Sequence, residues 1–372
     1  MDRLAKALAA RRLVVKVGSA LLVDRTGAVR GPWLDGLAAD VAGLRCQGRQ
    51  VGIGTSGAIP PGPARLGPPP RPPRLEGKQA AAAPGRILLA HAWQESLARH
   101  GLETAQILIT LEDTEARRRY LNARATVETL LKLGVVPVVN ENDTVATSEI
   151  RFGDNDRLSA RVAVMALADT LVLLSDVDGL CSADPRRDAA ARHLPVVETI
   201  TPEIEAMAGG SGSTLGTGGM VSKLIAAKIA TAAGCAVVLA AGEPEHPLAA
   251  LLAGAHCTLF SPATSPRRAR KDWIAASLAV LGSMRIDAGA VVALRRGSSL
   301  LPAGVTAVEG AFERGDAVLV RAPDGSPIAK GLAAFDAADA RALIGRRTDE
   351  IEAILGYRGR TEMVHRDDLV LL

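Results

Sequence analysis

The sequence predicts an α/β protein in which a mainly parallel sheet is sandwiched between helices, followed by a small β-rich domain. Short apolar runs alternate with segments of helical composition through most of the chain, which is typical of a parallel sheet with helices on both faces. Beyond about residue 280 the pattern changes to short β-type runs separated by glycines. At 372 residues the chain exceeds one ordinary domain, so we expect two.

A change in composition marks the expected domain boundary. The segment from Ser261 to Lys271 is rich in prolines and basic residues, which favours a linker. We therefore place the first domain at residues 1–262, the linker at residues 263–279 and the β-rich domain at residues 280–372. The β-type runs of the last domain lie at residues 290–294, 317–320, 328–330 and 369–372.

Composition limits the classes of protein that fit. Hydrophobic residues make up 48% of the chain and aromatic residues 2%, so alanine, valine and leucine must fill the core. The four cysteines are far apart and have no CxxC spacing, which argues against a disulfide or metal framework and fits a reducing cytosol. The amino terminus lacks the apolar region of a signal peptide, and no apolar run is long enough to span a membrane. A net charge of +4 is too small to indicate a nucleic-acid partner by itself, so we expect a cytoplasmic protein.

The first expected strand, residues 13–17, contains Lys16 and runs directly into Gly18 and Ser19. A lysine at a strand end beside a turn of small residues can reach a phosphate that backbone N–H groups also face. The alternative is a lysine whose ammonium group extends to solvent from an ordinary strand. Taken alone, the pattern favours that alternative.

The next segments predict a helix at residues 32–47 and a strand at residues 51–54 that ends in small hydroxylated residues. A proline-dense stretch at residues 60–73 predicts an extended, mobile loop. Residues 76–100 have helical composition but contain Pro84. An interior proline removes a backbone hydrogen bond and clashes with a preceding carbonyl, so we predict that this helix is broken or kinked just before Pro84.

Two further strands and a long helix are expected on either side of the middle of the chain. Residues 104–109 predict a strand, and residues 114–133 predict a helix because apolar residues recur at spacings of four and three. Gly134 follows where a helix-ending glycine is expected. Residues 171–174 predict a buried strand that ends in a serine and an aspartate at 175–176.

Two clusters of polar residues bracket a short segment near the middle of the chain. The first follows an apolar run at residues 135–139 that predicts a buried strand, and the second precedes an expected helix. Carboxamides and carboxylates at the carboxyl end of a strand fit a ligand site in an open α/β sheet. The alternative is that they only cap a turn and a helix start, but two clusters around an expected hairpin at residues 145–152 favour a site. The clusters are Asn140, Glu141, Asn142 and Asp143, and Asp154, Asn155 and Asp156.

The most glycine-rich segment, residues 209–223, opens an expected helix that carries Lys223 and Lys228 and ends at Gly234. Glycines let the backbone approach a polyphosphate, the helix N-terminus offers free N–H groups, and a lysine adds positive charge. The segment is not a Walker A motif, because the required glycine–lysine–hydroxyl spacing is missing. Alone, it fits a disordered loop equally well.

Taken together, these motifs resemble those of the glutamate 5-kinases, in the same order over nearly the whole chain. The shared segments are VVKVGS at 14–19, TSGA at 55–58, YLNAR at 120–124, NENDTVATSEIRFGDNDRLSA at 140–160, SDVDGL at 175–180, LGTGGMVSK at 215–223 and VHRDDLVL at 364–371. The resemblance implies an amino-acid-kinase domain followed by a PUA domain. It also implies transfer of the γ-phosphoryl group of ATP, with Mg²⁺ carried by the ATP, to the side-chain carboxylate of L-glutamate. That reaction is the first step of proline biosynthesis.

The resemblance also implies a role for each matching residue. Lys16 and Lys223 contact the phosphates, and Asp156 holds both lysines in place. L-Glutamate is bound by Ser56, Asn140, Asp143 and Asn155. ATP is bound by Lys16, Gly18, Ser19, Ser175, Asp176, Thr217, Gly218, Gly219, Met220, Val221, Ser222 and Lys223. The resemblance implies no protein ligand for a metal.

The chain departs from the family pattern at several positions. Pro60 and Pro61 stand where alanines are usual, and Pro84 and Arg86 where an apolar residue and glutamine are expected. Ser175 replaces the usual threonine and keeps the hydroxyl group. The resemblance further implies a homo-oligomer, and it raises feedback inhibition by proline as a question that the sequence leaves open.

Two other functions match parts of the sequence. A kinase of the same fold acting on aspartate, N-acetylglutamate or a nucleotide would share the glycine-rich loops but not the two polar clusters. Asp143 suits a free α-ammonium group, from which an N-acylated substrate would gain nothing. An RNA-binding function would need a basic, aromatic surface on the PUA domain. Against it, acidic residues outnumber basic ones by 13 to 12 from residue 280 onward, and the aromatic residues there are Phe312, Phe335 and Tyr357.

Overall fold

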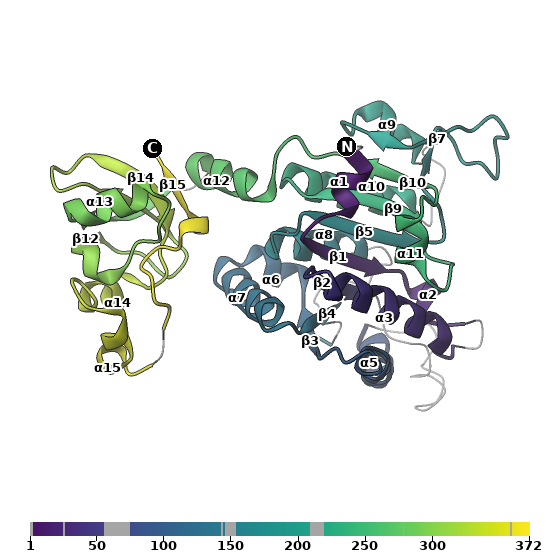
Figure 1. The fold of residues 1–372 in the computed structure, drawn as a ribbon, viewed down its shortest axis with the longest axis horizontal. Coiled ribbons are helices and arrows are strands. Elements are labelled where there is room, and N and C mark those ends of the chain that lie inside the picture. The colour runs from purple at the N-terminus through teal and green to yellow at the C-terminus, as the bar shows by residue number, and fades with distance from the viewer. Residues whose placement is uncertain are drawn as a thin grey trace. The chain divides into compact units, whose positions relative to one another are not determined.

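The computed structural model divides into two compact units, Met1–Pro266 and Arg267–Leu372 (Figure 1). It describes residues 3–24, 27–55, 75–142, 144–145, 154–208, 219–277, 279–357 and 359–372. Over this part of the chain, no helix combines the length and apolar character needed to cross a membrane.

The first unit is built on an eight-stranded sheet with the order β3-β4-β2-β1-β5-β9-β10-β8. Its strands are β1 (Arg12–Val17), β2 (Gln50–Thr55), β3 (Thr104–Ile109), β4 (Val136–Glu141), β5 (Thr170–Ser175), β8 (Val196–Val197), β9 (Ala236–Ala241) and β10 (Cys257–Phe260). The six strands from β3 to β9 are parallel, and β10 runs antiparallel to β9. This confirms the predicted mainly parallel sheet.

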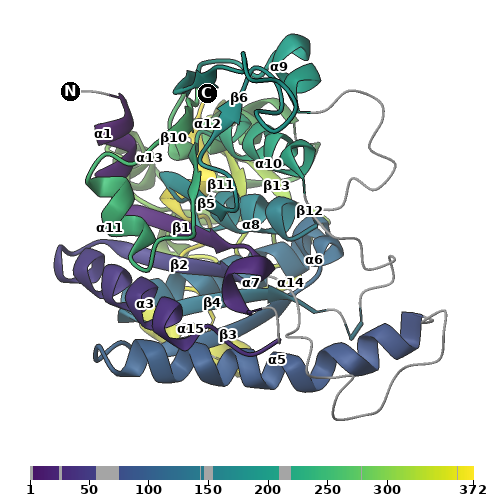
Figure 2. The same cartoon turned by 90° about the vertical axis from the view of Figure 1, so that its right-hand side faces the viewer.

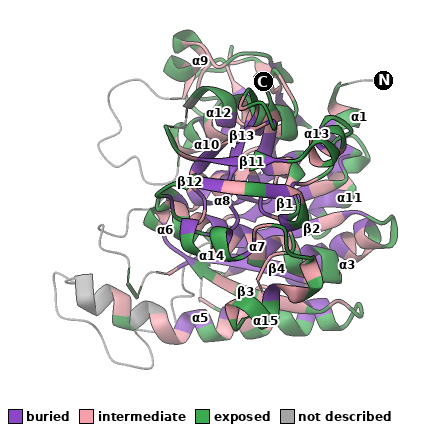
Figure 3. Cartoon of the chain, turned by 90° about the vertical axis from the view of Figure 1, so that its left-hand side faces the viewer, coloured by how far each residue is buried: buried purple, intermediate pink, exposed green. Residues whose placement is uncertain are grey.

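Helices cover both faces of this sheet, as the alternation of strands and helices predicted (Figure 2). One face is covered by α3 (Gly31–Cys46) and α5 (Leu75–Ala98), and the other by α7 (Arg117–Leu133), α8 (Asp154–Met165) and α10 (Met220–Ala232). The central strands β1 and β2 lie between the two layers and are buried over nearly their whole length (Figure 3). Smaller elements of this unit are α1 (Arg3–Leu8), α2 (Ser19–Leu22), α6 (Leu111–Glu115), β6 (Leu180–Cys181), β7 (His193–Leu194), α9 (Pro202–Met207) and α11 (Pro247–Leu252).

Alternate side chains of β1 face opposite cores. Val15 and Val17 belong to the core that includes residues of α3 and α5. Val14 belongs to the other core, with residues of α8 and α10. Because side chains alternate along a strand, Lys16 stands on the same face as Val14, beneath α8 and α10.

Helix α5 runs without interruption from Leu75 to Ala98 with Pro84 inside it, so the predicted break just before Pro84 is wrong. Figure 2 shows it as one long coil. Its second half carries Leu89, Trp93 and Leu97 at spacings of four, and all three are buried in the core. Burying side chains of this size stabilises by about 1.5–3 kcal/mol each. That gain offsets the roughly 3 kcal/mol that an interior proline costs. The loop predicted at residues 60–73 lies outside the described residues.

The helix predicted at residues 114–133 is in fact the pair α6 and α7. Thr110 and Asp113 form a capping box that starts α6, and the chain leaves helical geometry at Ala116. The capping residues lie upstream of the apolar pattern, which is why the periodicity alone missed this short helix. Gly134 ends α7 with φ 86°, as predicted.

The second unit contains a five-stranded sheet with the order β12-β11-β13-β14-β15. Its strands are β11 (Val280–Ile286), β12 (Val305–Gly310), β13 (Ala317–Arg321), β14 (Pro327–Leu332) and β15 (Leu369–Leu371). The other elements are α12 (Pro266–Ser277), α13 (Ala288–Arg295), α14 (Ala337–Ala342), α15 (Ile351–Leu355) and the 3₁₀ turns η1 (Pro302–Gly304), η2 (Thr348–Glu350) and η3 (Arg366–Asp368).

Two segments of this unit differ from expectation or add to it. Residues 290–294, predicted as a β-type run, lie in α13 instead. Asp287 caps that helix by accepting a hydrogen bond from the Ala290 N–H at 2.7 Å, and a short apolar run does not separate strand from helix by itself. The segment placed in the linker contains α12, whose Arg270 forms a buried ion pair with Asp368 at 2.7 Å.

Candidate active site

The carboxyl ends of four neighbouring parallel strands, β4, β2, β1 and β5, lie at one edge of the first unit's sheet. The chain places β2 and β4 on one side of β1 and then crosses to place β5 on the other, so the strand order reverses at β1. In open α/β sheets, ligands bind outside the carboxyl ends of the strands at such a switch point. Lys16, Asn140 and Ser175, which the sequence predicted as site residues, stand at the ends of three of these strands.

Asp156 lies in the first turn of α8 and faces Lys16. Its Oδ1 atom is 2.5 Å from Nζ of Lys16. Helix α8 approaches the sheet closely at Gly54 of β2, where an added Cβ atom would lie 2.4 Å from Oγ of Ser159. Since Ser159 is one turn beyond Asp156 on the same helix, the missing side chain at Gly54 lets α8 carry Asp156 against β1.

Lys223 reaches the same carboxylate from α10, which packs against α8. Its Nζ atom is 3.6 Å from Oδ2 of Asp156, and Ser222 Oγ donates a hydrogen bond to Oδ2 at 2.7 Å. Helix α10 follows Gly219, whose position as N-cap gives it no side-chain cap. The first turn of α10 therefore presents backbone N–H groups beside the two lysines, a combination that suits an anion.

The three charged side chains are almost completely buried, with exposed fractions of 9% for Lys16, 2% for Asp156 and 7% for Lys223. Burial lowers the pKa of Lys16, and the charge of Asp156 opposes that change only in part. Burial alone would raise the pKa of Asp156, but the charges of both lysines and the hydrogen bonds it accepts lower it below its ordinary value. With both lysines protonated, the group carries one excess positive charge in a site of low dielectric, which favours an anionic ligand.

Two asparagines predicted to bind substrate also lie at this edge. Asn140, at the end of β4, is 1% exposed, and its Oδ1 atom accepts a hydrogen bond from the Glu141 N–H at 2.9 Å. Asn155 precedes Asp156 on α8, and within the described structure its Oδ1 atom is buried without a hydrogen-bond partner. Such an atom is costly to leave unpaired, so it is suited to a ligand that can donate to it. Ser56 and Asp143 lie outside the described residues.

The remaining predicted contacts lie beside β1. Ser175 ends β5, and its hydroxyl donates to Oδ1 of Asp176 at 2.9 Å. Asp176 is exposed and close enough to Lys16 to oppose the lowering of its pKa. Gly18 follows β1 as the N-cap of α2, which begins at Ser19. Thr217 and Gly218 lie outside the described residues.

Comparison with known proteins identifies the family to which this arrangement belongs. Residues 11–241 match the amino acid kinase family, and residues 282–355 match the PUA domain. The glutamate 5-kinase of Paramagnetospirillum magneticum is 59% identical over 364 residues, which cover 98% of each chain. Glutamate 5-kinase 1 of Rhizobium meliloti is 59% identical over 97% of this chain and 92% of its own. The glutamate 5-kinase of Rhodospirillum rubrum is 58% identical over 96% of both.

The chain belongs to the glutamate 5-kinase family. The matched ranges put the kinase part of this family member on the first sheet and the PUA part on the second, which confirms the predicted fold class. The structure adds two features of this glutamate 5-kinase family member that sequence reasoning missed. One is the hydrogen bond from Ser222 to Asp156, and the other is the close approach of Ser159 to Gly54. Each joins residues far apart in the chain, and only the neighbouring Lys223 could have drawn attention to Ser222.

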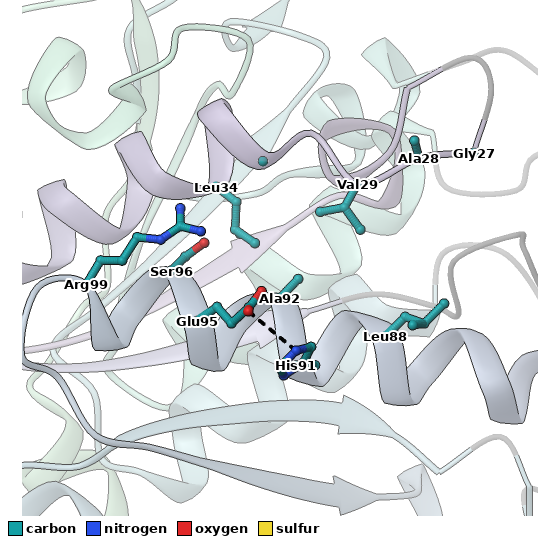
Figure 4. Close-up of a pocket in the computed structure, with 11 residues that line it drawn as sticks. Gly27, Ala28, Val29, Leu34, Leu88, His91, Ala92, Glu95, Ser96 and Arg99 are labelled. Carbon is teal, nitrogen blue, oxygen red and sulfur yellow. Dashed lines mark ion pairs between the residues drawn. The ribbon is translucent and has the colours of Figure 1, made fainter.

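A cavity of about 510 Å³ lies apart from these residues, between the start of α3 and one side of α5 (Figure 4). It is lined by Gly27, Ala28, Val29, Gly31, Leu34, Leu88, His91, Ala92, Glu95, Ser96 and Arg99. His91 and Glu95 form an ion pair at its rim at 3.5 Å. Among the residues whose placement is described, no group of three or more His, Cys, Asp or Glu could hold a metal ion.

Proposed function

We propose that this chain catalyses the ATP-dependent phosphorylation of the side-chain carboxylate of L-glutamate, giving L-glutamyl 5-phosphate and ADP, as the first step of proline biosynthesis. The observation that carries this proposal is the buried group of Lys16, Asp156 and Lys223 at the switch point of the sheet. The names of the relatives, which match nearly the full chain, support glutamate as the acceptor.

The chemistry needs positioning and charge compensation more than covalent help. Both ATP and the acceptor carboxylate are anions, so they repel one another as they approach. Lys16 and Lys223 approach from β1 and α10 and offset the charge that spreads over the transferred phosphoryl group. MgATP enters as a substrate and brings its own cation. A glutamate side chain is ionised near neutral pH, so no general base is required and the carboxylate attacks in line.

Asp156 keeps the two lysines together. Two protonated lysines in a buried site repel each other, and each loses hydration. The carboxylate between them offsets both costs, and it contacts Lys16 at 2.5 Å while Lys223 is at 3.6 Å. We assign Lys16, Lys223 and Asp156 to catalysis on this basis.

The acceptor and the nucleotide occupy different parts of the same edge in this proposal. Asn140 and Asn155 bind L-glutamate with Ser56 and Asp143, and the unpartnered Oδ1 atom of Asn155 supports a donor such as the α-ammonium group. ATP is bound by the residues that the resemblance implied, which are Lys16, Gly18, Ser19, Ser175, Asp176 and the segment from Thr217 to Lys223.

Trapping with hydroxylamine tests the reaction and the acceptor together. Hydroxylamine converts an acyl phosphate to a hydroxamate, so protein with MgATP and L-glutamate should form hydroxamate, and omission of ATP should abolish it. L-Aspartate and N-acetylglutamate serve as matched acceptors of different length and charge. Hydroxamate from either of these but not from L-glutamate would show that the acceptor is assigned wrongly, and none from any acceptor would remove the proposed activity.

Two finer properties complete the proposal. A homo-oligomer should show a mass above 38.5 kDa by light scattering. Feedback inhibition should appear as a loss of hydroxamate formation when proline is added at low glutamate. A monomer, or activity that is indifferent to proline, would remove the corresponding property and leave the reaction unaffected.

A further inference from the structure

The carboxylate of Asp156 has two oxygens and three partners. Oδ1 is 2.5 Å from Nζ of Lys16, a distance typical of a close ion pair. Oδ2 accepts a hydrogen bond from Ser222 Oγ at 2.7 Å. Nζ of Lys223 is 3.6 Å from the same Oδ2, beyond hydrogen-bond distance. The two lysines are therefore held unequally, and a serine takes the place at Oδ2 that the second lysine would otherwise fill.

We propose that Ser222 is a positioning residue that satisfies Oδ2 of Asp156, so that Lys223 is not drawn onto this oxygen and keeps its ammonium group directed to the transferred phosphoryl group. This inference rests on the proposed kinase reaction. It differs from the role implied by the resemblance, in which Ser222 contacts ATP.

The local structure explains how one residue can do this. Ser222 and Lys223 are successive residues in the first turn of α10, a helix of 13 residues that packs against α8. The serine hydroxyl has one proton and two acceptors within reach, Oδ2 of Asp156 at 2.7 Å and the Gly219 carbonyl at 2.9 Å. A carboxylate is the stronger acceptor, so it takes the proton.

Removal of the hydroxyl would leave Oδ2 of Asp156 as a buried acceptor that needs a donor. Lys223 lies 3.6 Å away and can close that gap by a side-chain rotation. A lysine drawn onto Asp156 would then compensate less charge on the phosphoryl group. The hydrogen bond from Ser222 also contributes to the low pKa of Asp156, so its loss would raise that pKa.

Kinetics of Ser222→Ala and Ser222→Thr test the proposal, with Thr231→Ala as the matched control. Thr231 lies on the same helix, and its hydroxyl donates to the Ala227 carbonyl at 2.8 Å, so its removal deletes a hydroxyl without touching Asp156. We expect Ser222→Ala to lower kcat on the order of ten- to a hundredfold, the loss that follows removal of a hydrogen bond to a charged group. The KM values for ATP and glutamate should stay nearly constant. Ser222→Thr should restore kcat, and Thr231→Ala should match the parent chain.

The pH profile separates positioning from a general loss of structure. Because the pKa of Asp156 rises without its hydrogen bond, the acid limb of kcat should move to higher pH in Ser222→Ala and return in Ser222→Thr. If Ser222→Ala is insoluble, Ser222→Cys, whose thiol is a weak donor, should show the same changes at smaller size. An unchanged kcat and acid limb, or a raised KM for ATP with unchanged kcat, would overturn the proposal. Absence of hydroxamate from the parent chain would instead overturn the kinase reaction itself.

Discussion

Replacement of Asp156 by asparagine should destabilise the first unit far more than the loss of an ordinary ion pair. The amide keeps the shape of the side chain but removes the charge between two lysines that are less than 10% exposed. Removing one partner of a buried ion pair costs about 3–5 kcal/mol, because the remaining charge stays buried without compensation. Here two lysines are left, and each disfavours the charge of the other.

The matched control is Glu115→Gln. Glu115 pairs with Arg161 at 3.0 Å, and its side chain is 61% exposed. An exposed pair of this kind contributes about 0–1 kcal/mol. Urea unfolding of the full chain at neutral pH, followed by the fluorescence of the buried Trp33 and Trp93, reports on the first unit. A first-unit midpoint for Asp156→Asn that coincides with that of Glu115→Gln would refute the reasoning.

The pH dependence of this difference has a definite sign. The pKa of Asp156 is depressed in the folded chain, so its contribution to stability is present above the unfolded value of 3.8 and is lost as pH falls through the folded value. The gap between the parent chain and Asp156→Asn should therefore be full at neutral pH and shrink in acid. The pKa of Lys16 is already lowered by burial, and loss of Asp156 should lower it further. The asparagine variant should then gain stability at alkaline pH as Lys16 sheds its proton, and a gap independent of pH would contradict both assignments.

Three other predictions follow from the same geometry. Lys16→Ala and Lys223→Ala should each lower kcat on the order of 10²–10³-fold with little change in KM, and near-normal turnover in either would remove that lysine from the mechanism. Gly36→Ala, which places a Cβ atom 2.1 Å from a backbone carbonyl oxygen, should cost about 1–3 kcal/mol of stability. Gly43→Ala on the same helix meets nothing within 4 Å and should add roughly 0.5–1 kcal/mol, so equal melting temperatures would contradict the packing of α3. A chain of residues 1–262 should fold and keep kinase activity, because every proposed site residue precedes the second unit; a soluble, folded but inactive truncation would show that the PUA unit completes the site.

Much of the site could be predicted from the sequence because a parallel sheet brings the carboxyl ends of its strands to one edge. Lys16, Asn140 and Ser175 each follow or end an apolar run, so their meeting at that edge follows from the fold class. The connection of Ser222 to Asp156 could not be predicted, because it depends on the packing of α8 against α10 across 66 positions of sequence.

The errors in the fold prediction have the same origin. Pro84 is unfavourable inside an isolated helix, but the buried Trp93 and its neighbours on α5 hold that helix to the core. Residues 290–294 are a short apolar run that fits a strand or a helix, and the cap at Asp287 decides for the helix. In both places an interaction outside the local pattern determines the structure.

Isotope transfer from the acceptor tests the central claim most directly. L-Glutamate labelled with ¹⁸O in its side-chain carboxylate would be incubated with the protein, MgATP and hydroxylamine. If the carboxylate oxygen attacks the γ-phosphorus, the new O–P bond carries the label. Hydroxylamine then attacks the carbonyl carbon and releases phosphate with one ¹⁸O atom. We predict one ¹⁸O per phosphate for every hydroxamate formed, measured by mass spectrometry. Phosphate without the label would mean that ATP is hydrolysed by water, which would contradict transfer to the glutamate carboxylate.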